Sequence, residues 1–217
     1  MTQGEKRDFP SSLKANSQKL EARLYLVLAP WKIQPPTHLR GTMQRMFLNP
    51  TDILSHLPIT AHAKVGDFGV GAGHYSFALA EKLGREGTIY AFDAFGPALD
   101  AIRRKGEHYP AEFHTLQSDL NEPIPIGDNL LHIAVVANIL HQIRERERFV
   151  MEVARVVRPG GTALVVDWIS SFKNMGPSSE AVLAPGEAVR LFRQAGFETG
   201  DMLPAGTHHF AFLATLK

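Results

Sequence analysis

The segment 65–74 constrains the fold more than any other part of this 217-residue sequence. It reads Val-Gly-Asp-Phe-Gly-Val-Gly-Ala-Gly-His, so that three alternate glycines follow a short apolar stretch and precede a helix predicted over 75–83. Glycines at this spacing let the main chain turn tightly from strand to helix and let a ligand approach the backbone closely. The segment therefore predicts an α/β fold with a ligand-binding turn. A tight turn without any ligand is the alternative.

The chain from residue 64 onward alternates strands and helices. Periodicity and turn residues predict strands at 65–68, 88–92, 112–116, 131–137 and 162–168. Between and after them they predict helices at 75–83, 97–105, 144–157 and 187–195, and a turn at 158–161. Two final strands, 198–203 and 208–215, form a hairpin. This order predicts a mostly parallel sheet with helices on both faces and one antiparallel strand.

Composition excludes several kinds of site. The sequence has no cysteine, which removes disulfides, thiolate metal sites, iron–sulfur clusters and cysteine nucleophiles. Its histidines are scattered without ligand spacing, so we expect no metal. The longest apolar runs are far shorter than the ~20 residues that span a bilayer, and the net charge of +1 indicates no nucleic-acid partner. We expect a cytoplasmic protein.

Two carboxylates near the glycines indicate what the turn binds. Asp67 precedes the glycines, where it would repel the pyrophosphate of a dinucleotide but would suit the cationic amino-acid end of a ligand. His74 also occupies the position at which the dinucleotide motif has Gly or Ala. Asp93 follows the strand 88–92, where a carboxylate accepts hydrogen bonds from both hydroxyls of a ribose. A helix N-cap is the alternative role for Asp93.

Further segments follow in a specific order. They are Ala91-Phe92-Asp93, Ser118-Asp119-Leu120, Ala137-Asn138-Ile139-Leu140-His141-Gln142, the run 154–161, Val165-Val166-Asp167-Trp168 and Gln194-Ala195-Gly196-Phe197. With the glycine segment, this series resembles the class I S-adenosylmethionine (SAM)-dependent methyltransferases, and within them the small-molecule group related to quinone-biosynthesis and sterol C-methyltransferases. The resemblance implies a Rossmann-like sheet of seven strands in the order 3-2-1-4-5-7-6, with strand 7 antiparallel. It covers residues 42–217, which we expect to form the SAM-dependent methyltransferase domain.

The N-terminal extension, residues 1–41, lies outside this resemblance. Residues 12–28 form a predicted amphipathic helix with Leu13, Leu20 and Leu24 on one stripe. Residues 1–50 hold eight Lys/Arg and three Asp/Glu, whereas the remainder carries a net negative charge. We expect this helix to pack on its own domain, on a second copy of the chain or on a partner protein.

The resemblance also implies roles for individual residues. Asp67, Gly69, Gly71 and Gly73 would hold the methionine moiety of SAM, Asp93 the ribose, and Asp119 with the Leu120 backbone the adenine. Asn138 follows the fourth strand as a further cofactor-binding residue. His141 and Asp167 lie at the same edge of the sheet as candidate catalytic residues, although His141 could simply begin the next helix and Asp167 could orient other groups. Met43, Met46 and Phe47 would offer the acceptor an apolar surface, or pack a helix onto the sheet.

Methyl transfer from a sulfonium is an in-line displacement, so positioning is its main catalytic requirement. A base is needed only where the acceptor must lose a proton. Asn138-Ile139-Leu140-His141 differs from the Asn/Asp-Pro-Pro-aromatic motif of enzymes that methylate adenine amines or glutamine amides. The sequence therefore predicts methylation of a small molecule. Methylation of a protein or RNA, and a non-catalytic SAM-binding regulatory domain, are the alternatives.

Overall fold

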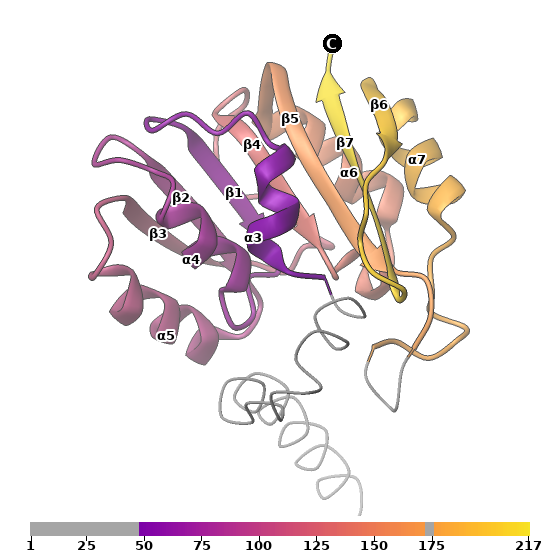
Figure 1. The fold of residues 1–217 in the computed structure, drawn as a ribbon, viewed down its shortest axis with the longest axis horizontal. Coiled ribbons are helices and arrows are strands. Elements are labelled where there is room, and N and C mark those ends of the chain that lie inside the picture. Colours follow the sequence, from indigo (N-terminus) through magenta and orange to yellow (C-terminus); the bar gives the residue numbers. More distant parts are fainter. Residues whose placement is uncertain (1–47, 172–175) are drawn as a thin grey trace, which may run out of the picture. The chain divides into compact units, whose positions relative to one another are not determined.

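The computed structural model describes residues 48–171 and 176–217. Within them, seven strands form one sheet in the order β3-β2-β1-β4-β5-β7-β6 (Figure 1). The strands are β1 (Lys64–Phe68), β2 (Thr88–Asp93), β3 (Glu112–Gln117), β4 (Leu131–Ala137), β5 (Val157–Trp168), β6 (Phe197–Met202) and β7 (His209–Leu216). The helices are α3 (Pro50–Ile53), α4 (His74–Ala80), α5 (Gly96–Gly106), α6 (Arg146–Val156) and α7 (Pro185–Gln194), with 3-10 turns η1 (Leu54–His56) and η2 (Leu140–Gln142). The predicted extension and Met43, Met46 and Phe47 lie outside the described residues.

The pairing confirms the predicted topology. Strands β3, β2, β1, β4 and β5 pair in parallel, whereas β7 is antiparallel to both β5 and β6. The chain winds outward from β1 in one direction to β3 and then crosses back to β4. Ligands of open α/β sheets bind at such a reversal, beyond the carboxyl ends of the strands. In this sheet the reversal lies between β1 and β4.

Apolar residues cover both faces of the central strands, as buried parallel strands require. On one face α3, η1 and α4 pack through Ile53, Leu54 and Leu79 against alternate residues of β1, β4 and β5. On the other face α6 and α7 pack through side chains that include Phe149 and Phe192. A third cluster joins α4 and α5 to β2. The sheet is therefore held rigidly on both sides, and its carboxyl edge is a fixed platform.

The start of β5 differs from the prediction. The sequence indicated a turn at 158–161, but β5 begins at Val157 and runs through these residues. Leu131 pairs with Val157 and Ile133 with Thr162, so β5 carries more residues than β4 over this stretch and bulges there. A bulge accommodates Pro159 and Gly160 because its extra residues are outside the ladder. Ahead of β1 the chain forms α3 and η1, and the Asn49 side chain caps α3, since its Oδ1 accepts the Thr51 N–H at 3.1 Å.

The described residues contain neither a helix suited to span a membrane nor a cluster suited to bind a metal ion. None of their helices combines the length and apolar character needed to cross a bilayer. No group of three or more His, Asp or Glu side chains within these residues is arranged to hold a metal ion.

Candidate active site

The glycine loop joins β1 to α4 and is fastened to the end of β2. The Gly69 and Val70 N–H groups both donate to the Phe92 carbonyl, at 2.8 and 2.9 Å. The Gly71 N–H donates to Asp93 Oδ2 at 2.9 Å. The loop and Asp93 are therefore a single hydrogen-bonded unit at the carboxyl edge of the sheet.

The three alternate glycines have different surroundings. A Cβ on Gly69 would lie 2.8 Å from Ile139, and one on Gly73 would overlap Ile102 and Phe77. A Cβ on Gly71 would meet only the Gly69 carbonyl oxygen, at 3.9 Å. Gly69 and Gly73 thus serve close packing within the protein, whereas at Gly71 the loop faces open space.

Asp93 is not the N-cap of α5, which was the alternative role for it. The N-cap position is Phe95, whose N–H donates to Asp93 Oδ1 at 2.9 Å. Each carboxylate oxygen of Asp93 therefore accepts one main-chain hydrogen bond and keeps acceptor capacity for a further donor.

Asp67 lies at the end of β1 and is 3% exposed. The Ser76 hydroxyl, in α4, donates to its Oδ2 at 2.6 Å. Burial raises the pKa of Asp67 to about 6, and the hydrogen bonds from Ser76 oppose that shift. A neighbouring cation would favour the charged form of this carboxyl.

Asp119 and Leu120 follow β3. Leu120 is buried, while Asp119 is exposed and its Oδ1 accepts the N–H and the side-chain amide of Asn121, both at 2.9 Å. These hydrogen bonds hold the pKa of Asp119 below its usual value. The Asp119 carboxylate is thereby oriented at the start of the β3–β4 connection.

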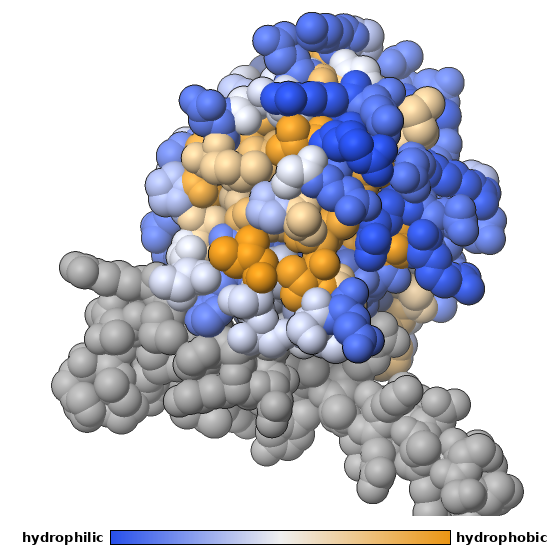
Figure 2. Space-filling view, turned by 90° about the vertical axis from the view of Figure 1, so that its right-hand side faces the viewer, coloured by the Kyte–Doolittle hydropathy of each residue, from blue (hydrophilic) through white to orange (hydrophobic). Residues whose placement is uncertain are grey.

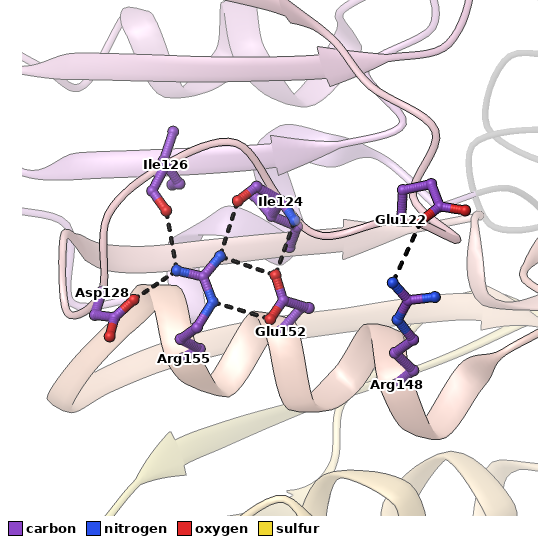
Figure 3. Close-up of polar contacts among 7 residues, drawn as sticks. All are labelled: Glu122, Ile124, Ile126, Asp128, Arg148, Glu152 and Arg155. Carbon is purple, nitrogen blue, oxygen red and sulfur yellow. Dashed lines mark hydrogen bonds and ion pairs between the residues drawn. The ribbon is translucent and has the colours of Figure 1, made fainter.

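Arg155 of α6 holds the same connection farther along (Figure 3). Its guanidinium donates to the carbonyls of Ile124 and Ile126 at 2.8 and 3.0 Å, and to the carboxylates of Glu152 and Asp128. Glu152 in turn accepts the Ile124 N–H at 2.8 Å. This network fixes the connection that carries Asp119 and Leu120 against α6.

His141 and Asp167 form a close pair at the ends of β4 and β5. His141 Nδ1 lies 2.7 Å from Asp167 Oδ1, and the His141 main-chain N–H donates to Oδ2 at 3.1 Å. The Trp168 N–H also donates to Oδ1, at 2.8 Å. The Asp167 side chain is fully buried and that of His141 is 11% exposed. In the part of the chain that the structure describes, His141 Nε2 has no hydrogen-bond partner.

Asn138 lies between β4 and His141 with a φ of 56°, which is uncommon for a residue other than glycine. Its N–H donates to the Val166 carbonyl at 2.9 Å, which fixes the residue against β5. Its side-chain oxygen is buried and has no hydrogen-bond partner. Such an atom costs free energy unless a donor reaches it.

Two residues of this edge were missed by sequence reasoning. Tyr75 follows the glycine loop in α4, and burial, then the charges of Asp67 and Asp167, raise the pKa of its phenol. His209 begins β7, directly opposite Trp168. The position of Tyr75 two residues after Gly73 was a usable signal. No local signal indicated His209, because only the long-range pairing of β7 with β5 brings it here.

Comparison with known proteins agrees with this geometry. Residues 66–165 match a family model described as a methyltransferase domain. Over this segment, a little under half of the chain, the protein is similar to methyltransferase domains. SAM is the cofactor of such domains.

Individual relatives are similar over part of their length. The ubiquinone/menaquinone biosynthesis C-methyltransferase UbiE of Neisseria meningitidis serogroup C is 29% identical over 122 residues, which are 52% of this chain and 48% of that protein. The 2-phytyl-1,4-naphtoquinone methyltransferase of Thermosynechococcus vestitus is 23% identical over 161 residues, covering 61% of this chain and 71% of that protein. The chain thus spans about half the length of the UbiE relatives it matches. A SAM-dependent methyltransferase from Aquifex aeolicus has the same fold, with a TM-score of 0.71, 23% identity and coverage of 97% and 100% of the two chains.

The side chains around the methyltransferase domain's glycine loop fit SAM. The cofactor carries hydrogen-bond donors in its ammonium group and ribose hydroxyls, and the site offers the Asp93 carboxylate and the unpartnered oxygen of Asn138 as acceptors. The open space at Gly71 leaves room for the cofactor to approach the main chain.

Proposed function

We propose that this protein transfers the methyl group of SAM to a hydroxylated ring in a small molecule. The single observation that carries the proposal is the His141–Asp167 pair, at the same edge of the sheet as the glycine loop. The names of the relatives, which are quinone methyltransferases, support a small ring compound over a protein or RNA. A preorganised base supports catalysis over a purely regulatory SAM-binding role.

The donor side of the site consists of residues on the loops after β1, β2, β3 and β4. Asp67 and the glycine loop would hold the methionine moiety, Asp93 the ribose, and Asp119 with Leu120 the adenine. Asn138 would accept a hydrogen bond from the ammonium group. Bound SAM supplies an electrophilic methyl group in this arrangement. The roles of all these residues in binding and orientation rest on the fit described above.

The acceptor side would use His141 as a general base. Asp167 accepts the hydrogen bond from Nδ1–H and so leaves Nε2 with a lone pair. Nε2 takes the proton of the acceptor hydroxyl, and the buried Asp167 carboxylate stabilises the imidazolium that forms. Deprotonation would place electron density on the ring oxygen, or on a ring carbon conjugated to it, and so make that atom the nucleophile that displaces S-adenosylhomocysteine from the methyl carbon. The chain's part in the reaction is thus to orient the acceptor and to remove one proton.

His141→Asn tests the proposal. General base catalysis contributes typically about 10²–10⁴-fold, so we expect kcat to fall by that factor. The affinity for SAM should stay within about twofold, because the donor contacts lie elsewhere. Transfer of a tritiated methyl group from SAM to a panel of phenols and quinols measures kcat, and calorimetry measures SAM affinity.

His108→Asn is a matched control, since His108 is exposed beyond the end of α5. It should leave both quantities unchanged. Equal kcat values for the two variants would remove His141 as the base, and failure of the folded wild-type protein to bind SAM would remove the proposed function altogether.

A further inference from the structure

A second histidine lies beside the His141–Asp167 pair. His209 is the first residue of β7 and faces Trp168 of β5 in the antiparallel register. The two rings are 4.1 Å apart between centroids and inclined by 41°. A Cβ on Gly176 would lie 2.8 Å from the indole, so the main chain at residue 176 also lies against Trp168. These contacts fix the His209 ring at the carboxyl edge of the sheet.

The ring of His209 is buried without satisfying its hydrogen-bonding capacity. The residue is only 7% exposed, and its Nδ1 has no hydrogen-bond partner. Among the described residues, only Nδ1 of His209 and Oδ1 of Asn138 are buried side-chain atoms in this state. Both lie at the edge that carries Asp167. Buried polar atoms without partners are rare in native proteins because each costs free energy, so a bound group that hydrogen-bonds either atom would recover that cost.

The surroundings keep His209 uncharged. Burial lowers its pKa to about 4, Asp167 opposes this effect, and His208 and His141 add to it. Among the described residues, Asp167 accepts hydrogen bonds from His141 and from the Trp168 N–H, and none from His209. A neutral imidazole beside a buried carboxylate suits an uncharged hydroxyl or carbonyl group and does not attract an anion.

We propose that His209 binds a second oxygen of the acceptor, distinct from the oxygen that His141 deprotonates. The site then selects rings with two oxygen substituents, such as quinols, over rings with one. This inference rests on the proposed function, because it assigns the specificity of the same site. His209 is accordingly a specificity-determining residue, while His141 remains the base.

Two probes that differ by one hydroxyl test this assignment: naphthalene-1,4-diol, kept reduced under anaerobic conditions, and 1-naphthol. With SAM as donor, the wild-type KM for the diol should be at least tenfold below that for 1-naphthol. In His209→Leu this ratio should fall below threefold. His209→Asn, which retains a polar group close to the position of Nδ1, should restore most of the ratio. Thermal unfolding by circular dichroism identifies the variants that are folded.

A binding measurement separates this inference from the proposed function. Trp31 and Trp168 are the only tryptophans, so Trp31→Phe leaves Trp168, which touches His209, as the single indole reporter. Fluorescence titration in the presence of S-adenosylhomocysteine gives the Kd of each probe without turnover. Preference for the diol that His209→Leu abolishes supports the inference, even if neither probe is methylated and the proposed function fails. Equal wild-type affinity for the probes, or a preference that persists in His209→Leu and His209→Asn, overturns it.

Discussion

At the scale of single residues, the site is defined by polar groups that the fold buries and leaves incompletely satisfied. Asp67 is buried with one hydrogen bond from Ser76, and Asn138 and His209 each bury an unpartnered atom. The contacts formed on folding do not fully offset the free-energy cost of burying these polar groups. The free protein therefore holds free energy in its site that a ligand of suitable chemistry recovers on binding.

Asp67→Asn should show the cost of the buried carboxyl. The folded-state pKa of about 6 lies above the ordinary value of 3.8, so the stabilising contribution of protonated Asp67 is present below pH 4 and lost as pH rises through 6. We expect the variant to exceed the wild type in free energy of unfolding by on the order of 3 kcal/mol above pH 7, and by little at pH 4. Urea unfolding across this pH range measures the difference.

Asp201→Asn is the control for that experiment, because Asp201 is exposed on β6. Its effect should be small and independent of pH. A stability difference between Asp67→Asn and the wild type that is constant from pH 4 to pH 8 would contradict the assignment.

The glycine loop offers a comparison between two alanine substitutions. At Gly71, where φ is 49°, alanine meets no neighbour but adopts a left-handed conformation that costs about 1–2 kcal/mol. At Gly73 the backbone strain is the same, and the added Cβ also overlaps Ile102 and Phe77. This overlap costs about a further 1–3 kcal/mol. We expect Gly71→Ala to retain the fold and lose SAM affinity by tenfold or more, and Gly73→Ala to lose mainly stability. Urea unfolding measures the loss of stability, and calorimetry with S-adenosylhomocysteine measures the loss of affinity. If the ratio of lost affinity to lost stability is the same for the two variants, the distinction between the two glycines is wrong.

At the scale of elements, the site depends on how connections are fastened to helices. The β3–β4 connection has no regular secondary structure between Gln117 and Leu131, yet it carries Asp119 and Leu120. Arg155 replaces that missing structure with hydrogen bonds to two of its carbonyls (Figure 3). The position of this part of the site is thus set from α6, by Arg155 together with Glu152, which accepts the Ile124 N–H.

Arg155→Ala should therefore loosen the connection. Hydrogen bonds to a charged group contribute about 1.5–3 kcal/mol each, but Arg155 is partly exposed and water replaces some of them, so we expect a loss of about 1–3 kcal/mol in the free energy of unfolding. SAM affinity should fall several-fold with it. Arg148→Ala is the matched control, because Arg148 forms only an exposed ion pair with Glu122 at 3.3 Å. Exposed pairs contribute about 0–1 kcal/mol, and equal effects of the two variants on urea unfolding would exclude the role of Arg155.

At the scale of the whole molecule, the described residues contain a complete seven-stranded sheet with apolar clusters on both faces. The outer strand β6 carries Glu198 and Asp201, charges that oppose edge-to-edge pairing with another sheet. Figure 2 views the molecule from the side on which β6 and α7 lie in Figure 1, and this face carries both apolar and polar residues. Among the described residues, both faces of the central strands are covered by apolar side chains.

Deletion of residues 1–29 should accordingly leave SAM affinity nearly unchanged. The predicted N-terminal extension, residues 1–41, precedes the segment 66–165 that matches the methyltransferase model. We propose that it contributes to acceptor handling or to association with a second copy or another protein. Calorimetry compares SAM affinity, and sedimentation compares the oligomeric state of the two chains. A truncated chain that does not fold would show that the extension belongs to the core.

Much of the fold and part of the site followed from local sequence signals. The alternation of strands with helices predicted a mostly parallel sheet, and the family resemblance implied its strand order. Residues at the ends of strands, such as Asp93 and His141, lie at one edge because parallel strands end together. Local signals could not predict residues whose position depends on pairing between strands that are far apart in the sequence. His209 reaches the edge only through the register of β7 with β5, and the bulge in β5 overrode the turn signal of Pro159 and Gly160.

The antiparallel direction of β7 has a consequence for biogenesis. The parallel strands contribute their last residues to the site, whereas β7 contributes its first, and β7 leaves the ribosome after the other six strands of this sheet. A nascent chain that has been synthesised as far as Asn138 already carries every group assigned to the donor. It acquires His209, and the second neighbour of β5 in the sheet, only when β7 is synthesised. A chain stalled just before β7 would thus carry the residues proposed for the donor, together with Arg155 and β5 that support them, while lacking His209.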